Sequence, residues 1–232
     1  MDLWRGSGRP LVIGHRGASA HAPENSLEAL DGAVRAGADI VEFDVQPGLI
    51  LGHAVEDASA TRVSLSAALE VLAPAGVGVQ LDLKLPGYES EALAAVDAHG
   101  LRARALVSTT WRETMLAMAR IAPDVPRVIG YPRDRYGVSR LPWPPVAGRV
   151  AAAAARHAMP LRAEVLFRRT SPTGFALHHT LCTARVVARS QRAGAPVLAW
   201  TANDPAMVLR LAALGVDAIV TDDPGMALAT LK

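Results

Sequence analysis

Two acidic residues stand two positions apart within a short apolar stretch at 40–46, IVEFDVQ. In a β-strand successive side chains alternate between faces, so Glu42 and Asp44 would point the same way. The apolar residues between them would point the other way and pack against helices. Two carboxylates held together in a site of low polarity repel each other, and one must then take a proton. A bound Mg²⁺ or Ca²⁺ removes that repulsion, because hard cations take oxygen ligands. The pair therefore predicts a metal site.

A second alternating stretch at 78–85, GVQLDLKL, carries an acid and a base on its polar face. Asp82 could supply a third oxygen to the same cation, and Lys84 would point the same way because it stands two residues later. Lys84 and Arg16 would then supply positive charge for an anion bound at the metal. A structural ion pair between Asp82 and Lys84 is the alternative interpretation of this stretch.

Two histidines end apolar stretches: His15 ends 11–15 (LVIGH) and His53 ends 49–53 (LILGH). Imidazole titrates near neutral pH and can act as a general acid or base. A metal ion, a lysine and an arginine would stabilise charge on the nonbridging oxygens of a phosphate. The combination predicts phosphoryl chemistry, with a structural role as the alternative for either histidine alone. We interpret the other histidines as surface or packing residues: His21, His99, His157, His178 and His179.

The stretches that carry these residues alternate with segments of helical periodicity. We expect strands at 11–15, 40–46, 78–85, 104–110, 125–132, 161–167, 195–203 and 217–223, with an extra extended segment at 49–53. We expect helices at 26–37, 64–73, 89–100, 111–122, 146–158, 180–194, 204–215 and 224–232. Strict alternation predicts a parallel sheet with right-handed crossovers. Eight units in this length favour one α/β domain over residues 1–232, a (β/α)₈ TIM barrel. An open doubly wound sheet is the alternative.

In a parallel barrel the catalytic groups lie at the carboxyl ends of the strands. Two late strands of the predicted barrel also end in polar residues. The seventh reaches Trp200 and Asn203, and the eighth ends in Asp222 and Asp223. The coincidence of polar strand ends on consecutive units favours an active site over a set of unrelated structural residues.

The composition excludes several classes of protein. Half of the 232 residues are hydrophobic and the formal net charge is only +2, which indicates a folded core. Aromatic residues make up 4% and no basic stripe occurs, so we expect no nucleic-acid partner. The single cysteine, Cys182, excludes an internal disulfide framework. No long apolar run or signal-peptide pattern occurs, so we expect a cytoplasmic protein without stable membrane insertion.

Five segments together resemble the glycerophosphodiester phosphodiesterase family: IGHRGASAHAPENSLEAL, GADIVEFDVQ, the strand that ends in His53, LDLK, and VLAWTANDPAMVLRLAALGVDAIVTDDP. The resemblance spans nearly the whole chain. It implies a TIM barrel that hydrolyses glycerophosphodiesters to an alcohol and glycerol 3-phosphate. It also implies a small-molecule phosphodiester substrate and one divalent cation, Ca²⁺ or Mg²⁺, with Mn²⁺ as a further option.

The resemblance also implies roles for the reacting and metal-binding residues. His15 and His53 would form the acid/base pair, in which one deprotonates a substrate hydroxyl or water that attacks phosphorus and the other protonates the leaving alkoxide. Glu42 and Asp44 would be metal ligands. Asp82 would provide the third metal contact.

Further roles follow for the residues around the phosphate and the alcohol. Arg16 and Lys84 would hold the phosphate. Glu24 would lie at the mouth with Asn25 supporting its loop, and Trp200 would form one wall of the substrate pocket.

The chain departs from the family pattern at three places. Asp82 stands where the family has a glutamate, one methylene longer. Pro47 and Gly48 make a tighter connection than the family's turn, and the segment after His53 is short. Ala54 stands where the family has an aspartate that would orient His53, a role that Glu56 or Asp57 could take over.

Three alternatives follow from these departures and from the loop at 133–145. One is a barrel that binds a phosphorylated ligand without turnover. Another is a phospholipase D-like enzyme that cleaves lysophospholipids. The third is a phosphatidylinositol- or sphingomyelin-cleaving lipase, for which Tyr136 and Trp143 would form an aromatic rim.

Overall fold

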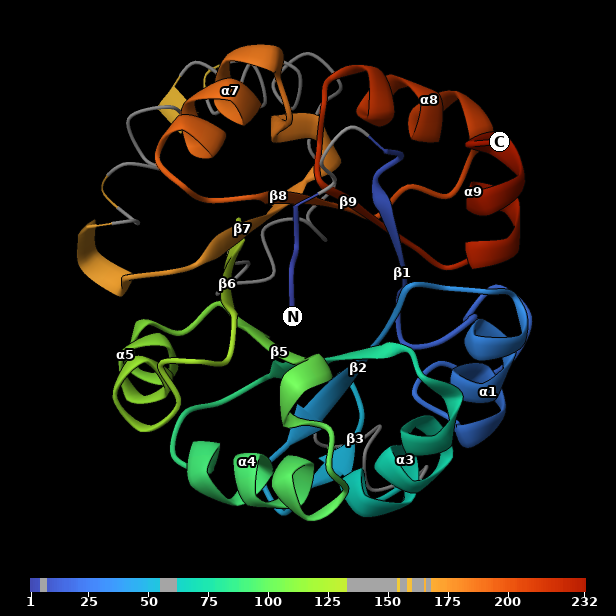
Figure 1. The fold of residues 1–232 in the computed structure, drawn as a ribbon, viewed down its shortest axis with the longest axis vertical. Helices are drawn as coiled ribbons and strands as arrows, with labels where there is room; N and C mark the ends of the chain where they lie inside the picture. Colours follow the sequence, from blue (N-terminus) through green and yellow to red (C-terminus); the bar gives the residue numbers. More distant parts are fainter. Residues whose placement is uncertain (5–7, 55–61, 133–153, 155–157, 160–164, 166–167) are drawn as a thin grey trace.

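The protein's structure is a computed structural model that describes residues 1–4, 8–54, 62–132, 154, 158–159, 165 and 168–232. Within these residues, eight parallel strands close into a barrel (Figure 1). The barrel closes because β1 pairs with both β2 and β9. The strands are β1 Leu11–Gly14, β2 Ile40–Gln46, β4 Gly78–Leu83, β5 Ala105–Thr109, β6 Arg127–Tyr131, β7 Gly174–His178, β8 Val197–Trp200 and β9 Ala218–Thr221. The predicted (β/α)₈ fold is confirmed.

A short antiparallel strand extends the sheet beyond β2. Strand β3, Ile50–Leu51, pairs with the end of β2 in the register Val45 to Leu51. The connection turns at Pro47 and Gly48. Gly48 has a φ of 84°, a conformation that residues with a side chain disfavour. The extended segment expected at 49–53 is therefore a hairpin arm, and it carries the chain back to His53 beside the barrel mouth.

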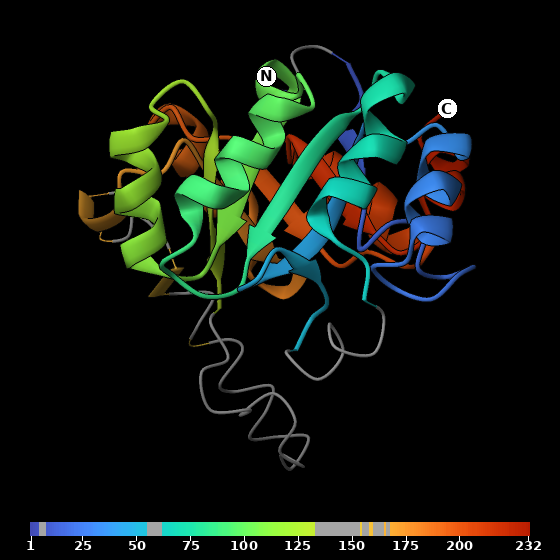
Figure 2. The same cartoon turned by 90° about the horizontal axis from the view of Figure 1, so that it is seen from below.

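Helices surround the strands (Figures 1 and 2). The α-helices in the described part of the chain are α1 Leu27–Arg35, α3 Leu65–Leu72, α4 Glu89–Ala98, α5 Arg112–Ile121, α7 Ala184–Arg192, α8 Pro205–Ala213 and α9 Pro224–Thr230. Short 3₁₀ turns lie at η1 Ala73–Ala75, η2 Arg102–Arg104 and η4 His179–Leu181. Most of the α-helices begin at a side-chain cap that accepts a backbone N–H, as these residue types favour: Ser26, Ser64, Thr183, Asp204 and Asp223. None of the described helices is long and apolar enough to cross a bilayer.

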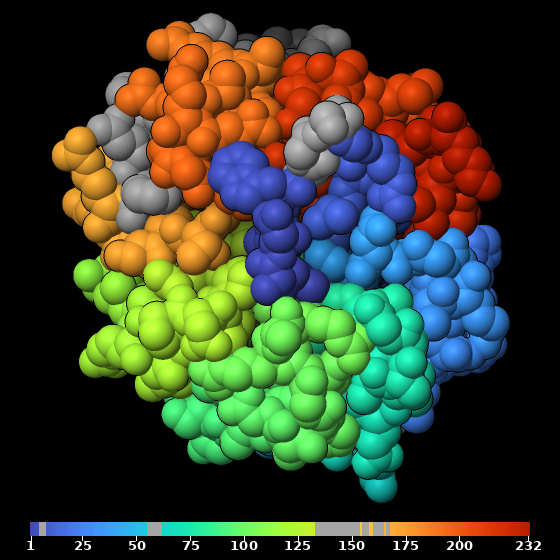
Figure 3. All heavy atoms as spheres, in the orientation of Figure 1, coloured from blue at the N-terminus to red at the C-terminus, as the bar shows by residue number. Residues whose placement is uncertain are grey.

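Apolar residues fill two separate spaces, as alternation along the strands requires. Val41, Phe43 and Val45 of β2 pack outward against the helices, as the sequence predicts. A smaller cluster fills the barrel interior: Leu3, Ile13, Ile40, Leu106, Val128, Ala176, Leu198, Ala218 and Val220. The amino-terminal residues, dark blue in Figure 3, lie over the centre of the face seen there. Leu3 is buried in this interior cluster, so the amino terminus closes the end of the barrel where the strands begin.

One expected strand is wrong. Of residues 161–167, which the sequence predicts as a strand, the structure describes only Val165, and Val165 is helical and exposed. Arg168–Thr170, which follow, are helical as well. The strand at this place in the barrel is β7, Gly174–His178, which follows a Ser-Pro-Thr turn and carries the buried run Phe175–Leu177. A barrel strand is buried on both faces, so a continuous apolar run between turn residues marks it better than the alternation seen at 161–167.

Candidate active site

Polar side chains meet where the parallel strands end. His15 directly follows β1, and Glu42 and Asp44 lie in β2. Asp82 lies near the end of β4, and Asp222 directly follows β9. Strand β1 lies between β9 and β2, and β2 pairs with β4, so the four strands that carry these groups are consecutive in the sheet. The structure therefore brings the predicted site residues to one end of the barrel.

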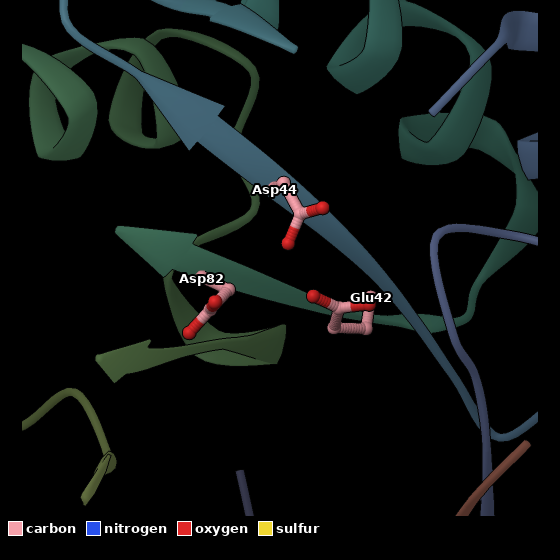
Figure 4. A group of neighbouring side chains, drawn as sticks. All are labelled: Glu42, Asp44 and Asp82. Carbon is pink, nitrogen blue, oxygen red and sulfur yellow. The ribbon is translucent and has the colours of Figure 1, made fainter. Parts of the chain in front are cut away.

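Three carboxylates form the centre of this site (Figure 4). Asp44 lies opposite Asp82 in the pairing of β2 with β4. Glu42 lies two residues before Asp44 on the same face of β2. One oxygen from each of Glu42, Asp44 and Asp82 lies within 4.8 Å of the other two. Glu42 and Asp44 are 4% and 1% exposed, so neither is shielded by bulk water. These three side chains could hold one hard cation, and the shorter Asp82 does reach the group.

The charges of the three acids are only partly compensated. Burial, followed by the charge of Asp44, raises the pKa of Glu42 above its ordinary value. Burial would also raise the pKa of Asp44, but the charge of Lys84 and contacts with His53 and Arg16 lower it instead. Asp44 is thus held ionised, whereas Glu42 favours its protonated form until further positive charge arrives.

Lys84 lies between two of the carboxylates. Its Nζ pairs with Asp44 Oδ1 and with Asp82 Oδ2. Burial would lower the pKa of Lys84, but the charges of Asp82 and Asp44 outweigh it and raise that pKa. The ammonium therefore stays charged. The sequence-based alternative, a plain ion pair of Asp82 with Lys84, describes only part of this arrangement because Asp44 shares the lysine.

Arg16 crosses the mouth and touches four polar groups. Its backbone N–H donates to Glu42 Oε2 at 2.8 Å, with the residue at a φ of 54°. The guanidinium places Nε 2.9 Å from Asp44 Oδ2 and Nη1 2.6 Å from Glu24 Oε2. Its Nη2 lies 2.9 Å from His53 Nδ1. Arg16 thereby ties the half-exposed Glu24 and His53 to the buried carboxylates.

His53 is held without the aspartate that the family pattern would place after it. Besides Arg16, its Nδ1 lies 3.4 Å from Asp44 Oδ2. The amide of Gln46 donates to the backbone carbonyls of Gly52 and His53 at 3.2 and 2.9 Å, which fixes the end of the hairpin arm. Glu56 and Asp57, named above as substitutes, lie outside the described residues.

His15 has a carboxylate partner that sequence reasoning did not assign. Its Nδ1 lies 2.6 Å from Asp222 Oδ1. Burial would lower the pKa of His15, but the hydrogen bond to Asp222 and the charges of Glu42 and Asp44 raise it. The sequence signal for Asp222 is the polar end of the last strand. That signal points to Asp222 but not to its contact with His15.

Two further residues hold the carboxylates and were not given that role beforehand. Asn25 donates to Asp44 Oδ2 at 3.1 Å and accepts from the Asp44 backbone N–H at 2.9 Å. Ser108 in β5 donates to Asp82 Oδ1 at 2.8 Å and itself accepts from the amide of Gln80 at 3.0 Å. Asn25 was expected only to support its loop. Ser108 carries no sequence signal, because a serine in a strand is common.

The expected pocket wall, Trp200, ends β8 and is half-buried. Its ring lies edge-on to His178, with centroids 5.1 Å apart. Burial and the neighbouring His179 lower the pKa of His178 to about 4, so this imidazole is neutral near pH 7. The interpretation of His178 as a packing residue agrees with this contact.

The model of the glycerophosphoryl diester phosphodiesterase family matches residues 15–47 and 79–226. The chain is 22% identical over 258 residues to the glycerophosphodiester phosphodiesterase of Caldanaerobacter subterraneus, covering 93% of this chain and 95% of that one.

Two solved structures share the fold. A phosphodiesterase of Oleispira antarctica, solved with the product sn-glycerol 3-phosphate, aligns with a TM-score of 0.70 at 23% identity, covering 96% of each chain. A glycerophosphodiester phosphodiesterase of Parabacteroides distasonis aligns with a TM-score of 0.71 at 17% identity, covering 96% of this chain and 97% of that one. The family match extends from His15 through the acidic pair to the last strand, and it includes most of the site built above. The chain belongs to the glycerophosphoryl diester phosphodiesterase family, whose members are phosphoric diester hydrolases.

Proposed function

We propose that this protein hydrolyses glycerophosphodiesters to an alcohol and glycerol 3-phosphate with one divalent cation, Ca²⁺, Mg²⁺ or Mn²⁺. The observation that carries the proposal is the group of Glu42, Asp44 and Asp82, whose oxygens lie within 4.8 Å of one another at the barrel mouth. The product bound to the Oleispira antarctica phosphodiesterase, sn-glycerol 3-phosphate, supports this substrate class.

The residues present fit a hard cation. All three donors are carboxylates, which Ca²⁺ and Mg²⁺ prefer. Burial, followed by the charge of Asp44, raises the pKa of Glu42, and a bound cation would favour its ionised form. When bound, the cation would polarise a phosphoryl oxygen and stabilise the negative charge that develops during displacement at phosphorus.

Arg16 and Lys84 would bind the nonbridging oxygens of the phosphate. Both side chains lie against the carboxylates and are less than one-fifth exposed, so their charge acts in a site with little water. On substrate binding each would exchange part of its contact with Asp44 for the phosphate. Glu24 would hold the guanidinium of Arg16 in the orientation seen here, because their contact is 2.6 Å long.

His15 and His53 would move the protons. One imidazole would take a proton from the attacking water while the other gives a proton to the leaving alkoxide. His53 would keep its orientation through Arg16 and Asp44, which replace the aspartate missing at position 54. Trp200 would pack against the carbon atoms of the glycerol or alcohol part.

The test is hydrolysis of sn-glycero-3-phosphocholine with Ca²⁺, Mg²⁺ or Mn²⁺, followed by release of glycerol 3-phosphate. We expect turnover that EDTA abolishes and that returns on adding the metal. His15→Ala and His53→Ala should each lower kcat/KM by about 100- to 10,000-fold. His99→Ala is the matched control, because His99 caps the far end of α4 and, among the described residues, its ring hydrogen-bonds to the carbonyl of Ala95 and to Ser66.

A folded wild-type protein that releases no glycerol 3-phosphate with any of the three metals would contradict the proposal. If that protein still bound glycerol 3-phosphate, the binding barrel without turnover would replace it. Release of choline phosphate or phosphate instead would place the cleavage at the wrong bond.

A further inference from the structure

The environment of His15 distinguishes its two ring nitrogens. Nδ1 lies 2.6 Å from Asp222 Oδ1, and both groups come from the residues that directly follow the neighbouring strands β1 and β9. The backbone N–H of His15 also donates to the Thr221 carbonyl at 2.8 Å. These two contacts fix both the ring and its backbone against the last strand.

Asp222 is in turn held by one amide side chain. Asn203 Nδ2 donates to Asp222 Oδ2, and Asn203 Oδ1 accepts from the Asp222 backbone N–H at 3.0 Å. The carboxylate therefore has Oδ2 on Asn203 and Oδ1 on His15, and the side chain of Ser19 also hydrogen-bonds to it. Because Asn203 follows β8, three consecutive strands of the barrel contribute to this chain of contacts.

An ionised carboxylate only accepts hydrogen bonds, so Nδ1 of His15 must carry the proton in its bond to Asp222. Neutral imidazole has one protonated nitrogen, and Nε2 is then left with a free lone pair. A carboxylate in this position also stabilises the imidazolium that forms when Nε2 takes up a second proton. The pair thus prepares Nε2 of His15 to accept a proton.

We propose that Asp222, held by Asn203, is the positioning residue that sets the tautomer of His15 and makes its Nε2 the general base of the reaction. The inference rests on the proposed function. In the step, Nε2 takes a proton from the attacking water as the water oxygen bonds to phosphorus. The bond from phosphorus to the alcohol breaks, and the leaving oxygen takes a proton from the imidazolium of His53. One histidine gains a proton and the other loses one.

The arrangement predicts an unusual result for Asp222→Asn. Because Asn203 Nδ2 donates to the outer oxygen, the new amide keeps its oxygen on Asn203 and turns its NH₂ towards His15. Nδ1 of His15 must then accept, and the proton moves to Nε2. We expect kcat/KM to fall by about 100-fold or more. The affinity for Ca²⁺ should stay within about threefold of wild type, since Asp222 does not contact the three carboxylates.

A compensating variant separates this role from a structural one. In Asp222→Asn combined with Asn203→Asp, the new carboxylate at 203 accepts from the NH₂ group at 222. The amide oxygen then faces His15 and restores the proton to Nδ1. We expect the double variant to recover at least about tenfold of the lost kcat/KM, although each substitution removes a native group.

The experiment measures kcat/KM, Ca²⁺ affinity and ¹⁵N chemical shifts of His15 at high pH for the wild type and both variants. Proton on Nδ1 in the wild type and double variant, and on Nε2 in Asp222→Asn, supports the proposal. An unchanged tautomer in Asp222→Asn, or a double variant no better than the single one, overturns it. If Asp222→Asn does not fold, Asn203→Ala replaces it, with kcat expected to fall and KM to stay.

The two proposals fail differently. A wild type that turns over no diester defeats the proposed function, whereas the ¹⁵N shifts still decide whether Asp222 sets the tautomer. Wild-type turnover with kcat/KM unaffected by Asp222→Asn defeats only the inference about Asp222.

Discussion

At the scale of single residues, the site depends on how Asp82 is held. An aspartate is one methylene shorter than a glutamate, yet Asp82 lies within reach of Glu42 and Asp44. Ser108 donates to Oδ1 of Asp82, and Gln80 donates to Ser108, so the serine proton must point at the acid. This leaves Oδ2 for a cationic partner, the place that Lys84 fills in the structure.

Removing the hydroxyl of Ser108 should therefore weaken cation binding. Outer groups that orient a metal ligand typically change affinity by about 10- to 100-fold, and we expect a loss of that size for Ser108→Ala. Titration calorimetry with Ca²⁺ measures it. Ser66→Ala is the control, because Ser66 lies on α3 and its hydroxyl hydrogen-bonds to His99 in the described part of the chain. Equal Ca²⁺ affinity in Ser108→Ala and wild type would show that Asp82 needs no such support.

The raised pKa of Glu42 predicts that the stability of the metal-free protein depends on pH. Its pKa in the folded state is raised above 4.5, so above that pH the folded state binds more protons than the unfolded chain. Stability must then fall as the pH rises from 4.5 towards the folded pKa. The pKa of Asp44 is lowered instead, so its contribution to the stability of the folded state is present above pH 3.8 and is lost as the pH falls below that value.

Denaturant unfolding in EDTA at several pH values measures this effect. Wild type should lose stability relative to Glu42→Gln as the pH rises above 4.5, and saturating Ca²⁺ should remove the loss. A difference between the two proteins that stays constant with pH would mean that Glu42 ionises freely in the folded state.

At the scale of elements, the loop between β1 and α1 positions the acidic strand. Asn25 is 1% exposed and lies at a φ of 60°, where its amide spans the side chain and the backbone N–H of Asp44. The backbone conformation and the two hydrogen bonds serve the same purpose. They fix the position of β2 along the barrel axis so that the side chain of Asp44 lies at the barrel mouth.

Asn25→Gly keeps the backbone conformation accessible and deletes the amide. Leaving the buried Asp44 N–H without its partner should cost about 1–3 kcal/mol in the free energy of unfolding. Asn25→Ala should cost more, because alanine disfavours a positive φ. Denaturant unfolding of the two variants separates the contributions. Equal stability of Asn25→Gly and wild type would contradict the role assigned to the amide.

The elements also show what a sequence can predict. Strands β1, β2 and β4 end in residues whose chemistry and spacing are visible along the chain, so Glu42, Asp44 and Asp82 were found together. The pairs His15–Asp222 and Ser108–Asp82 join positions far apart in sequence, and nothing in the local pattern links them. Strand β7 was missed because its buried run from Phe175 to Leu177 does not alternate.

At the scale of the whole molecule, the two ends of the barrel have different roles. The candidate active-site residues lie where the strands end, whereas Leu3 packs among interior residues where the strands begin. Met1 lies so close to Gly78, the first residue of β4, that a Cβ there would clash with the terminal methyl group of Met1. Stability can therefore be altered at one end without touching the chemistry at the other.

Leu3→Ala should lower the free energy of unfolding by about 2 kcal/mol, the lower end of the range for leucine in a core. Both kcat/KM and Ca²⁺ affinity should remain those of wild type. Trp4→Ala is the matched control, since Trp4 is 41% exposed. A loss of Ca²⁺ affinity in Leu3→Ala would show that the two ends are coupled.

The barrel itself followed from eight alternating units, because such a pattern leaves few other ways to bury the strands. The central claim is that one cation lies among Glu42, Asp44 and Asp82 where the phosphodiester binds. A crystal structure with Ca²⁺ and glycerol 3-phosphate tests it most directly. We expect the ion about 2.3–2.6 Å from an oxygen of each carboxylate and in contact with the phosphate. An ion that does not bind Asp82, so that Asp82 keeps only its contacts with Lys84 and Ser108, would contradict the account. A phosphate bound away from Arg16 would also contradict it.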